Sequence, residues 1–378
     1  MKNRRKSNKN RTMTHTVQAR ETLYNISKRY SLTVEQLVKI NNLANNNLFI
    51  GQVLKIDLPI PSNNNPLPIP PQKLTVFDQR TVFQVKKETK GTYNNFVLTF
   101  PSPTGTKSSG IMRDNYPSPN LVNSKGVSYG GQSLFEDNKS LFLDICQQSF
   151  YIDLLHYIAK NEGCFDAVNS YDRAIFSFGF IQFTGALASG SMLTRVLQRF
   201  KTRDEYAFND CLGKFGINIQ NYKVPTFQVE TPSGVKEGDA AYLAIANDLQ
   251  LTAAFIASGF RRSMIRSQIE IALEEYVFKA LSPTVSIQLN GISVPLNTLL
   301  RTQGGFTLRV DLCVNRGLGG SLIILKKAIE QVISESKIQD YSQINESRIV
   351  EVVAMNDVEA WKKQRVLKLL NSGFGFGK

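Results

Sequence analysis

The sequence predicts a multidomain protein: a small α/β module with βααβ order, a proline-rich linker, a small β segment, and a mainly α-helical domain with a short β-hairpin (α+β). Three observations predict this order. The chain has 378 residues with 42% hydrophobic content, which exceeds the usual size of one domain. Proline and asparagine dominate 59–73, and apolar residues recur at helical spacing from about residue 140 onward.

The N-terminal residues 1–13 predict a basic, disordered tail. They contain no apolar segment of the kind a signal peptide needs, and no run of about 18 apolar residues occurs elsewhere. We therefore expect a protein made in the cytoplasm, without a transmembrane segment. Action at a bacterial cell wall or in the periplasm would then require lysis, injection or release from a particle.

The formal net charge of +14 suits anionic cell-wall polymers, membrane surfaces or nucleic acid. No zinc-finger spacing or RNA-binding aromatic motif is present, so nucleic acid is not expected as a partner. The chain has only two histidines, and its four cysteines form no CxxC pair, so we expect no metal and no organic cofactor. The cysteines are expected to be buried free thiols, with a Cys146–Cys164 disulfide as the alternative.

Residues 14–58 predict a compact strand, helix, helix, strand unit. The strand THTV leads into a helix with Thr22 as its N-cap, and Thr33 caps the next helix before Gly51 turns the chain into the strand VLKIDL. The apolar positions of the two helices have helical spacing: Leu23, Ile26 and Tyr30, then Leu37, Ile40 and Leu43.

This unit resembles the LysM module through TVQARETLYNISKRY, LVKINNL and FIGQVLKI, which occur in the family's order and spacing. One departure is Arg20-Glu21, where the family has Gly-Asp. The resemblance implies binding of peptidoglycan, chitin or another N-acetylglucosamine-containing glycan in a shallow groove. The implied groove residues are Glu21, Thr22 and Leu23 on one side, and Asn47, Phe49 and Ile50 on the other. A LysM fold used only for protein docking is the alternative.

The stretch 59–73 carries six prolines and predicts an extended spacer. Residues 74–139 predict a β-containing linking region, because 74–100 alternates as a hairpin, whereas the Pro, Gly, Ser and Asn-rich 101–132 favours a surface loop. The remainder, 140–378, predicts helices at 147–161, 190–201, 239–260, 263–281, 306–315, 319–335 and 345–370. A GLGG sequence at 317–320 predicts a helix–helix turn.

The candidate catalytic residue is Glu162, at the end of the helix predicted before Gly163. The helix macrodipole disfavours a carboxylate there, and an apolar surrounding would raise its pKa, as a proton donor to a glycosidic bond requires. Glycoside hydrolysis commonly uses a second carboxylate. Asp172 follows on a predicted antiparallel turn and is the first candidate for this role. Asp166 is the other candidate, with capping or bracing of the turn after the helix as the alternative, and Ser177 is expected to position water.

The pattern Glu162, Asp172, Ser177 and Gly179 resembles the phage-type lysozymes of the lysozyme-like superfamily. The segment S.GFIQ at 177–182 and the sequence at 315–317 are also similar to soluble lytic transglycosylases. Those enzymes need only the Glu, because the 6-hydroxyl of the sugar closes onto the anomeric carbon.

The two resemblances together imply a LysM-tethered glycosidase that degrades peptidoglycan. Glu162 would protonate the leaving oxygen, and Asp172 would stabilise the sugar cation or activate water. Ser177 would position that water, and Gln182 and Asn315 would line the cleft.

Three alternatives remain open at this stage. The enzyme cleaves chitin or chitosan; the chain is a non-catalytic wall-binding component of a phage tail or contractile injection device, with a degenerate lysozyme fold; or it is a delivered toxin with an immunity protein as partner.

Overall fold

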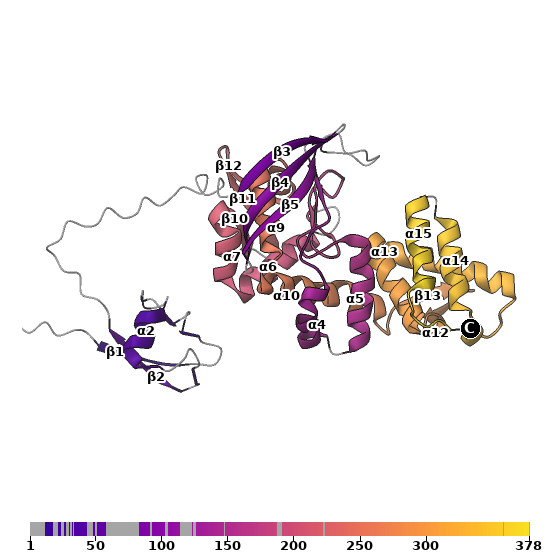
Figure 1. Cartoon of the computed structure of the whole chain (residues 1–378). Coiled ribbons are helices and arrows are strands. Elements are labelled where there is room, and N and C mark those ends of the chain that lie inside the picture. Colours follow the sequence, from indigo (N-terminus) through magenta and orange to yellow (C-terminus); the bar gives the residue numbers. More distant parts are fainter. Residues whose placement is uncertain are drawn as a thin grey trace, which may run out of the picture. The chain divides into compact units, whose positions relative to one another are not determined.

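The computed structural model describes residues 12–17, 22–23, 26–27, 30, 32, 34–43, 48–49, 51–57, 83–90, 93–102, 105–113, 123, 126–146, 148–186, 191–221, 224–357 and 359–377. The chain divides into two compact units, 1–73 and 74–378 (Figure 1). The predicted spacer at 59–73 and most of the predicted tail at 1–13 lie outside the described residues.

The N-terminal unit pairs strand β1 (Thr12–Thr16) antiparallel with β2 (Val53–Asp57), and helix α2 (Val34–Asn41) lies between them in sequence. The side chain of Asn41 ties helix to strand, because its amide donates to the Lys55 carbonyl at 2.9 Å and accepts from the Lys55 N–H at 2.6 Å. Of the predicted apolar positions, Leu23, Ile26 and Leu37 are buried, and Tyr30, Ile40 and Leu43 are partly buried against the same core. The core also contains Val17, Leu32, Leu54 and Ile56.

The larger unit contains a seven-stranded antiparallel sheet in sequential order. Its strands are β3 (Gln84–Lys90), β4 (Tyr93–Ser102), β5 (Gly105–Arg113), β6 (Val127–Tyr129), β7 (Val168–Asn169), β8 (Ser177–Phe178) and β9 (Phe183–Thr184). The hairpin predicted within 74–100 is present as β3–β4, with Lys90 opposite Tyr93. The sheet joins segments on both sides of residue 140, so the predicted linking region and the short strands after Glu162 share one sheet.

The prediction of a surface loop over 101–132 is wrong for its described residues. Strand β5 pairs with β4 along its whole length, and β6 joins β5 to β7. The sequence GTKSSGIMR lacks the apolar alternation by which a strand is recognised, so the sequence pattern did not predict its pairing with β4.

The described helices of the larger unit are α4 (Lys139–Ile145), α5 (Ser149–Glu162), α6 (Met192–Arg203), α7 (Glu205–Cys211), α8 (Gly238–Ala246), α9 (Leu249–Ser258), α10 (Arg262–Ala272), α11 (Phe278–Leu281), α12 (Leu296–Leu299), α13 (Gln303–Ser336), α14 (Glu346–Asn356) and α15 (Ala360–Lys368). A π-helical segment, η4 (Leu273–Val277), joins α10 to α11. Two small sheets were not predicted: β10 (Ile217–Asn221), β11 (Pro225–Thr231) and β12 (Gly234–Glu237), and the hairpin β13 (Ser286–Leu289) with β14 (Ile292–Pro295).

Two of the predicted helices are each divided. The stretch 239–260 breaks into α8 and α9, because the Asp248 carboxylate accepts from the N–H groups of Gln250 and Leu251 and starts a new helix. The stretch 345–370 breaks into α14 and α15. The predicted helices 306–315 and 319–335 both lie within α13, which consists of two helical parts separated by a kink at Gly317 (φ 68°, ψ 166°), within the GLGG sequence where the turn was predicted.

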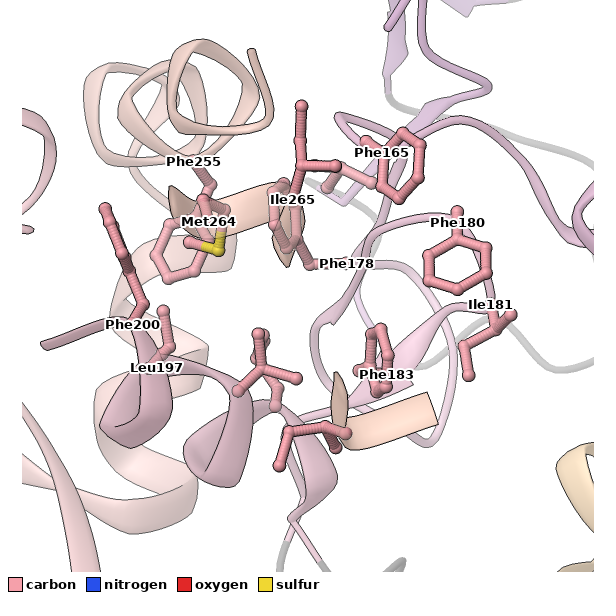
Figure 2. Close-up of a cluster of buried hydrophobic side chains, with 14 of the residues drawn as sticks. Phe165, Phe178, Phe180, Ile181, Phe183, Leu197, Phe200, Phe255, Met264 and Ile265 are labelled. Carbon is pink, nitrogen blue, oxygen red and sulfur yellow. The ribbon is translucent and has the colours of Figure 1, made fainter. Parts of the chain in front are cut away.

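The larger unit has two hydrophobic cores. The first core is rich in phenylalanine and gathers side chains from the short strands, α6, α9 and α10 (Figure 2); it includes Phe165, Phe178, Phe180, Ile181, Phe183, Leu197, Phe200, Phe255, Met264 and Ile265. The second core is aliphatic and lies among β13, β14 and the C-terminal helices. Helix α13 serves both, because Val310 and Cys313 belong to the first core, and Leu308 and Leu312 to the second.

Among the described helices, none taken singly has the length and apolar character needed to cross a bilayer. The pair α8 and α9 meets those criteria only together, and it is bent by 97°.

A substitution at Gly179 tests the packing of the short strands against α10. Its φ is 89°, and an added Cβ would lie 2.2 Å from Gln268 Oε1, which accepts from the Phe180 N–H. We expect Gly179→Ala to lower the free energy of unfolding by about 3 kcal/mol, because left-handed strain and a clash with a buried amide add together. The measurement is urea unfolding followed by fluorescence of Trp361, the single tryptophan of the chain.

Gly291→Ala is the matched control for this substitution. Gly291 also has a positive φ, 79°, but nothing lies within 4 Å of an added Cβ. Its cost should be about 1 kcal/mol, from backbone strain alone. Equal costs for the two variants would contradict close packing of Gly179 on Gln268.

Candidate functional site

Glu162 is the last residue of α5, where the structure places it at the edge of the first core. The helix ends at Gly163, whose N–H donates to the Ala159 carbonyl at 2.9 Å, and an added Cβ there would lie 2.7 Å from the Ala167 side chain. The Glu162 side chain is 16% exposed, so its carboxyl is largely removed from water. This burial is what the sequence analysis expected of a proton donor.

A buried cation lies against Glu162. The Arg365 guanidinium, from α15, donates through Nη1 to Glu162 Oε1 at 2.5 Å and through Nη2 to Asp311 Oδ1, on α13, at 2.7 Å. Its Nε also donates to Asp311, at 3.2 Å. We call Glu162, Asp311 and Arg365 the buried triad; it joins three helices that are far apart in sequence.

Burial and charge act in opposite directions on the triad. Burial raises the pKa of Glu162 above its ordinary value of 4.5, and this outweighs the lowering by the Arg365 cation; the nearby Asp311 charge raises it further. Burial by itself would lower the pKa of Arg365, but the Asp311 and Glu162 carboxylates raise it above its ordinary value. Arg365 therefore stays charged, while Glu162 holds a proton more readily than an exposed glutamate.

Only Glu162 Oε1 is engaged by the cation. Within the described part of the chain, Oε2 accepts no hydrogen bond, and it is not among the buried side-chain atoms without a partner. Oε2 is thus the oxygen of Glu162 that Arg365 leaves available to carry a proton.

Gln182 lies close to Gly163, the residue that follows Glu162. Its Nε2 would be 3.8 Å from a Cβ at Gly163, and the same amide donates to the Gly179 carbonyl at 3.1 Å. Gln182 has φ 53° in the turn between β8 and β9, a strained backbone that the short strands hold in place. Burial raises the pKa of the Tyr276 hydroxyl, and electrostatic interaction with Cys313 and Glu162 raises it further. Tyr276 is therefore a further neighbour of Glu162.

Asn315 lies one helical turn after Asp311, and its Nδ2 donates to the Asp311 carbonyl at 2.8 Å. A hollow of about 20 Å³ opens here, lined by Asp311, Asn315, Arg316, Asp357, Lys362 and Arg365, among others. The hollow has room for about one water molecule. Asn315 and the Arg365 partner of Glu162 therefore share one small cavity.

The other predicted catalytic residues have local structural contacts. The Asp172 carboxylate accepts from Asn169 Nδ2 at 3.1 Å and from the Ala174 N–H at 2.9 Å, which holds the turn between β7 and β8. Ser177 is buried in β8. Among the described contacts, neither residue is hydrogen-bonded to Glu162 or to Gln182.

Asp166, the bracing candidate, is fully buried. Its carboxylate accepts from the N–H groups of Gln132 and Ser133, both at 2.8 Å, and from the Tyr129 hydroxyl at 3.0 Å. Burial raises its pKa, against the lowering effect of these hydrogen bonds. Asp166 thus joins the loop after β6 to the turn after α5, next to Glu162 but turned to the main chain.

The implied glycan groove of the N-terminal unit is described only in part. Phe49 is 75% exposed and Thr22 is exposed, whereas the Leu23 side chain is buried in the core, so only its main chain can line a groove. The segment of Phe49 is tied to the end of β1, because the Gly51 N–H donates to the Val17 carbonyl at 2.8 Å. Glu21, Asn47 and Ile50 lie outside the described residues.

Sequence reasoning missed Asp311 and Arg365. Asp311 lies within an apolar helical run, and a carboxylate among buried residues is a signal that could have found it. Arg365 lies in the basic stretch KKQR, typical of a solvated helix face, and nothing there marks the one side chain that turns inward.

All four cysteines are free thiols. Burial raises the pKa of Cys146 and Cys164 to about 11, which leaves them unreactive. In the described part of the chain, no three His, Cys, Asp or Glu side chains gather closely enough to hold a metal ion.

A family model of the LysM domain matches residues 15–57. The N-terminal unit is therefore a LysM domain, a module that binds peptidoglycan and related N-acetylglucosamine-containing glycans. No curated protein and no solved structure matches the chain.

Removal of the central cation tests the buried triad. Arg365→Met leaves Glu162 and Asp311 buried without a positive charge, and we expect a loss of about 3–5 kcal/mol in the free energy of unfolding at pH 7. The loss should shrink as pH falls, because a protonated Glu162 needs no cation. Urea unfolding at pH 7 and at pH 4.5 measures both effects.

Lys368→Met, an exposed substitution on the same helix, is the control and should cost less than about 0.5 kcal/mol. If Arg365→Met proves no more costly than this control, the triad does not stabilise the fold.

Proposed function

We propose that the chain is a glycosidase of peptidoglycan, carried to the cell wall by its LysM domain. The observation that supports it is Glu162: a largely buried carboxyl at a helix end, with a raised pKa and one oxygen that Arg365 does not engage. The residue after it, Gly163, lies close to Gln182 in the turn between two short antiparallel strands. A carboxylic acid that keeps its proton above the ordinary range is what protonation of a glycosidic oxygen requires.

In the proposed reaction Glu162 Oε2 gives its proton to the leaving oxygen of the glycosidic bond. The carboxylate that forms is stabilised by Arg365, which already holds the other oxygen. Arg365 is therefore a positioning residue that prevents rotation of the carboxyl and stabilises the negative charge after proton transfer. Gln182 and Asn315 contact the sugars on the two sides of this acid.

The second carboxylate decides between hydrolysis and transglycosylation. Asp172 is the proposed partner for hydrolysis, with Ser177 positioning the water, and both would have to reach the sugar from a turn that now engages them. The engagement of Asp172 favours a second candidate, a lytic transglycosylase reaction, in which Glu162 acts alone and the 6-hydroxyl of the sugar attacks the anomeric carbon. One departure counts against this second candidate: Val314 stands where those enzymes have a substrate-holding Tyr.

The LysM domain would raise the local concentration of Glu162, the proposed proton donor, at the glycan. Such tethering multiplies the effect of a weak binding module without any new contact. The protein would reach the wall from the cytoplasm by lysis, injection or particle release. A wall-binding component of a tail or injection device, without catalysis, is the competing proposal, and the small hollow at Arg365 is the observation that favours it.

Glu162→Gln separates these proposals. The wild type should release soluble fragments from purified peptidoglycan, and Glu162→Gln should reduce release by at least 10³-fold, since an amide gives no proton. Mass spectrometry of the products is the measurement. Reducing-end sugars mean hydrolysis and anhydro ends mean transglycosylation.

Two controls accompany this assay. Asp153→Asn removes an exposed carboxylate from the same helix and should retain full activity. Co-sedimentation of Glu162→Gln with insoluble wall should equal that of the wild type, whereas Phe49→Ala should bind less. Fragment release by Glu162→Gln at the wild-type rate would remove Glu162 as the acid; no release by the wild type, with binding retained, would support the non-catalytic proposal.

The pH dependence of fragment release tests the environment of the acid. Because burial raises the pKa of Glu162, the alkaline limb of the activity profile should lie above pH 4.5. Asp311→Asn removes a negative charge that contributes to the raised pKa, so its limb should move to lower pH. A limb that stays in place or moves to higher pH in this variant would contradict the coupling of Asp311 to the acid.

A further inference from the structure

A groove of about 300 Å³ runs along the part of α13 that follows Gly317 and along α14. Its apolar lining consists of Ile323, Ile324 and Val353, and its polar lining includes Arg316, Lys327 and Asn356. Ile323 is 73% exposed, which is unusual for an isoleucine on a helix whose other face packs in a core. The groove is ligand-sized and belongs to no contact assigned above.

The two cations that line the groove differ in whether they have an ion-pair partner. Arg316 donates to Asp357 at 3.0 Å, and Lys327 is exposed and has no ion pair within the described part of the chain. The side-chain amide of Asn356 donates through Nδ2 to Gln331 Oε1 and leaves its own oxygen, Oδ1, available as an acceptor. The groove therefore offers an aliphatic floor beside one unpaired ammonium and one amide acceptor, which fits a ligand with small apolar side chains, a carboxylate and N–H groups.

The groove continues into the candidate site. Arg316 and Asp357 line both the groove and the small hollow that contains Asn315 and Arg365. A ligand that leaves the neighbourhood of Glu162 along α13 would meet the groove first at Arg316. The groove is thus placed for a branch of the substrate rather than for the scissile sugars themselves.

We infer that this groove binds the stem peptide of peptidoglycan. This inference rests on the proposed function, and it specifies peptide-bearing glycan over chitin. The stem is a short peptide with alanine methyl groups and free carboxylates, whereas chitin is an uncharged polyhydroxyl chain without either. The aliphatic floor takes the methyl groups, Lys327 takes a carboxylate, and the Asn356 carbonyl accepts a peptide N–H.

Binding of free stem peptide to the full-length protein tests the inference without any need for cleavage. The probes are L-alanyl-γ-D-glutamyl-L-lysyl-D-alanine and its diaminopimelate counterpart, observed by saturation-transfer NMR at millimolar concentration. The wild type should bind at least one of them. Ile323→Asp and Lys327→Glu should each weaken binding at least fivefold.

Matched controls carry the same changes elsewhere on the unit: Ile292→Asp, at an isoleucine 64% exposed on β14, and Lys236→Glu, on β12. Both should bind like the wild type. Absence of binding, or equal weakening in variants and controls, overturns the inference. Self-association of the wild type that Ile323→Asp abolishes would assign the groove to a second copy of the chain and would overturn it as well.

Fragment release distinguishes the two proposals. If the wild type cuts intact peptidoglycan and amidase-treated, peptide-free strands at the same rate, and the groove variants match it, the glycosidase proposal stands and the groove inference fails. If peptide binds as expected but no fragments appear, the groove is a wall-binding surface and the glycosidase proposal fails.

Discussion

The rest of the larger unit depends on the placement of one buried arginine. Arg365 lies 203 residues after Glu162 in sequence, and it connects the end of α5 to α13 and to the C-terminal helix α15. The two carboxylates lie where the first and second cores meet. A buried charge is tolerated only with partners of good geometry, so any rearrangement that separates the three helices leaves an uncompensated charge in a dry environment. The triad therefore fixes how the second core docks on the first.

The same interaction determines what Glu162 can do. Pairing with Arg365 favours the ionised carboxylate and burial favours the neutral acid, and the raised pKa shows that burial prevails. In the proposed reaction, an acid in this balance would give up its proton to a substrate, and Arg365 would already compensate the negative charge that forms. Because Asp311 shares the arginine, the cation never lacks a partner while Glu162 is protonated. The triad thus accommodates both protonation states of Glu162 without moving a helix.

Local patterns were enough to predict the parts of the fold that are stabilised locally. The strand, helix, helix, strand order of the N-terminal unit follows from apolar spacing within about 45 residues, and its resemblance to LysM from motifs in the same stretch. The end of α5 at Gly163 follows from a helical stripe followed by a glycine. One strand and one buried cation were not recognised from local patterns. Strand β5 has no apolar alternation in its sequence, yet it pairs with β4 along its whole length. The Asp172 carboxylate, chosen for its spacing from Glu162, accepts hydrogen bonds from Asn169 and Ala174, and its part in catalysis stays a prediction. Arg365 was missed because sequence spacing carries no information on which of several neighbouring cations turns inward.

The break at Gly317 explains why the candidate site and the groove adjoin. Before the break, α13 packs Val310 and Cys313 against the first core and carries Asp311 and Asn315; after it, the helix packs Leu325 and Ala328 in the second core beside α14. Nothing lies within 4 Å of a Cβ added at Gly317, so space does not require glycine there; a φ of 68° with ψ of 166° does. The part before the break already contacts the second core as well, through Leu308 and Leu312, and the part after it continues along that core in a new direction. The break thus supplies the change of direction at which Arg316 lines both the hollow beside the triad and the groove of Ile323 and Lys327.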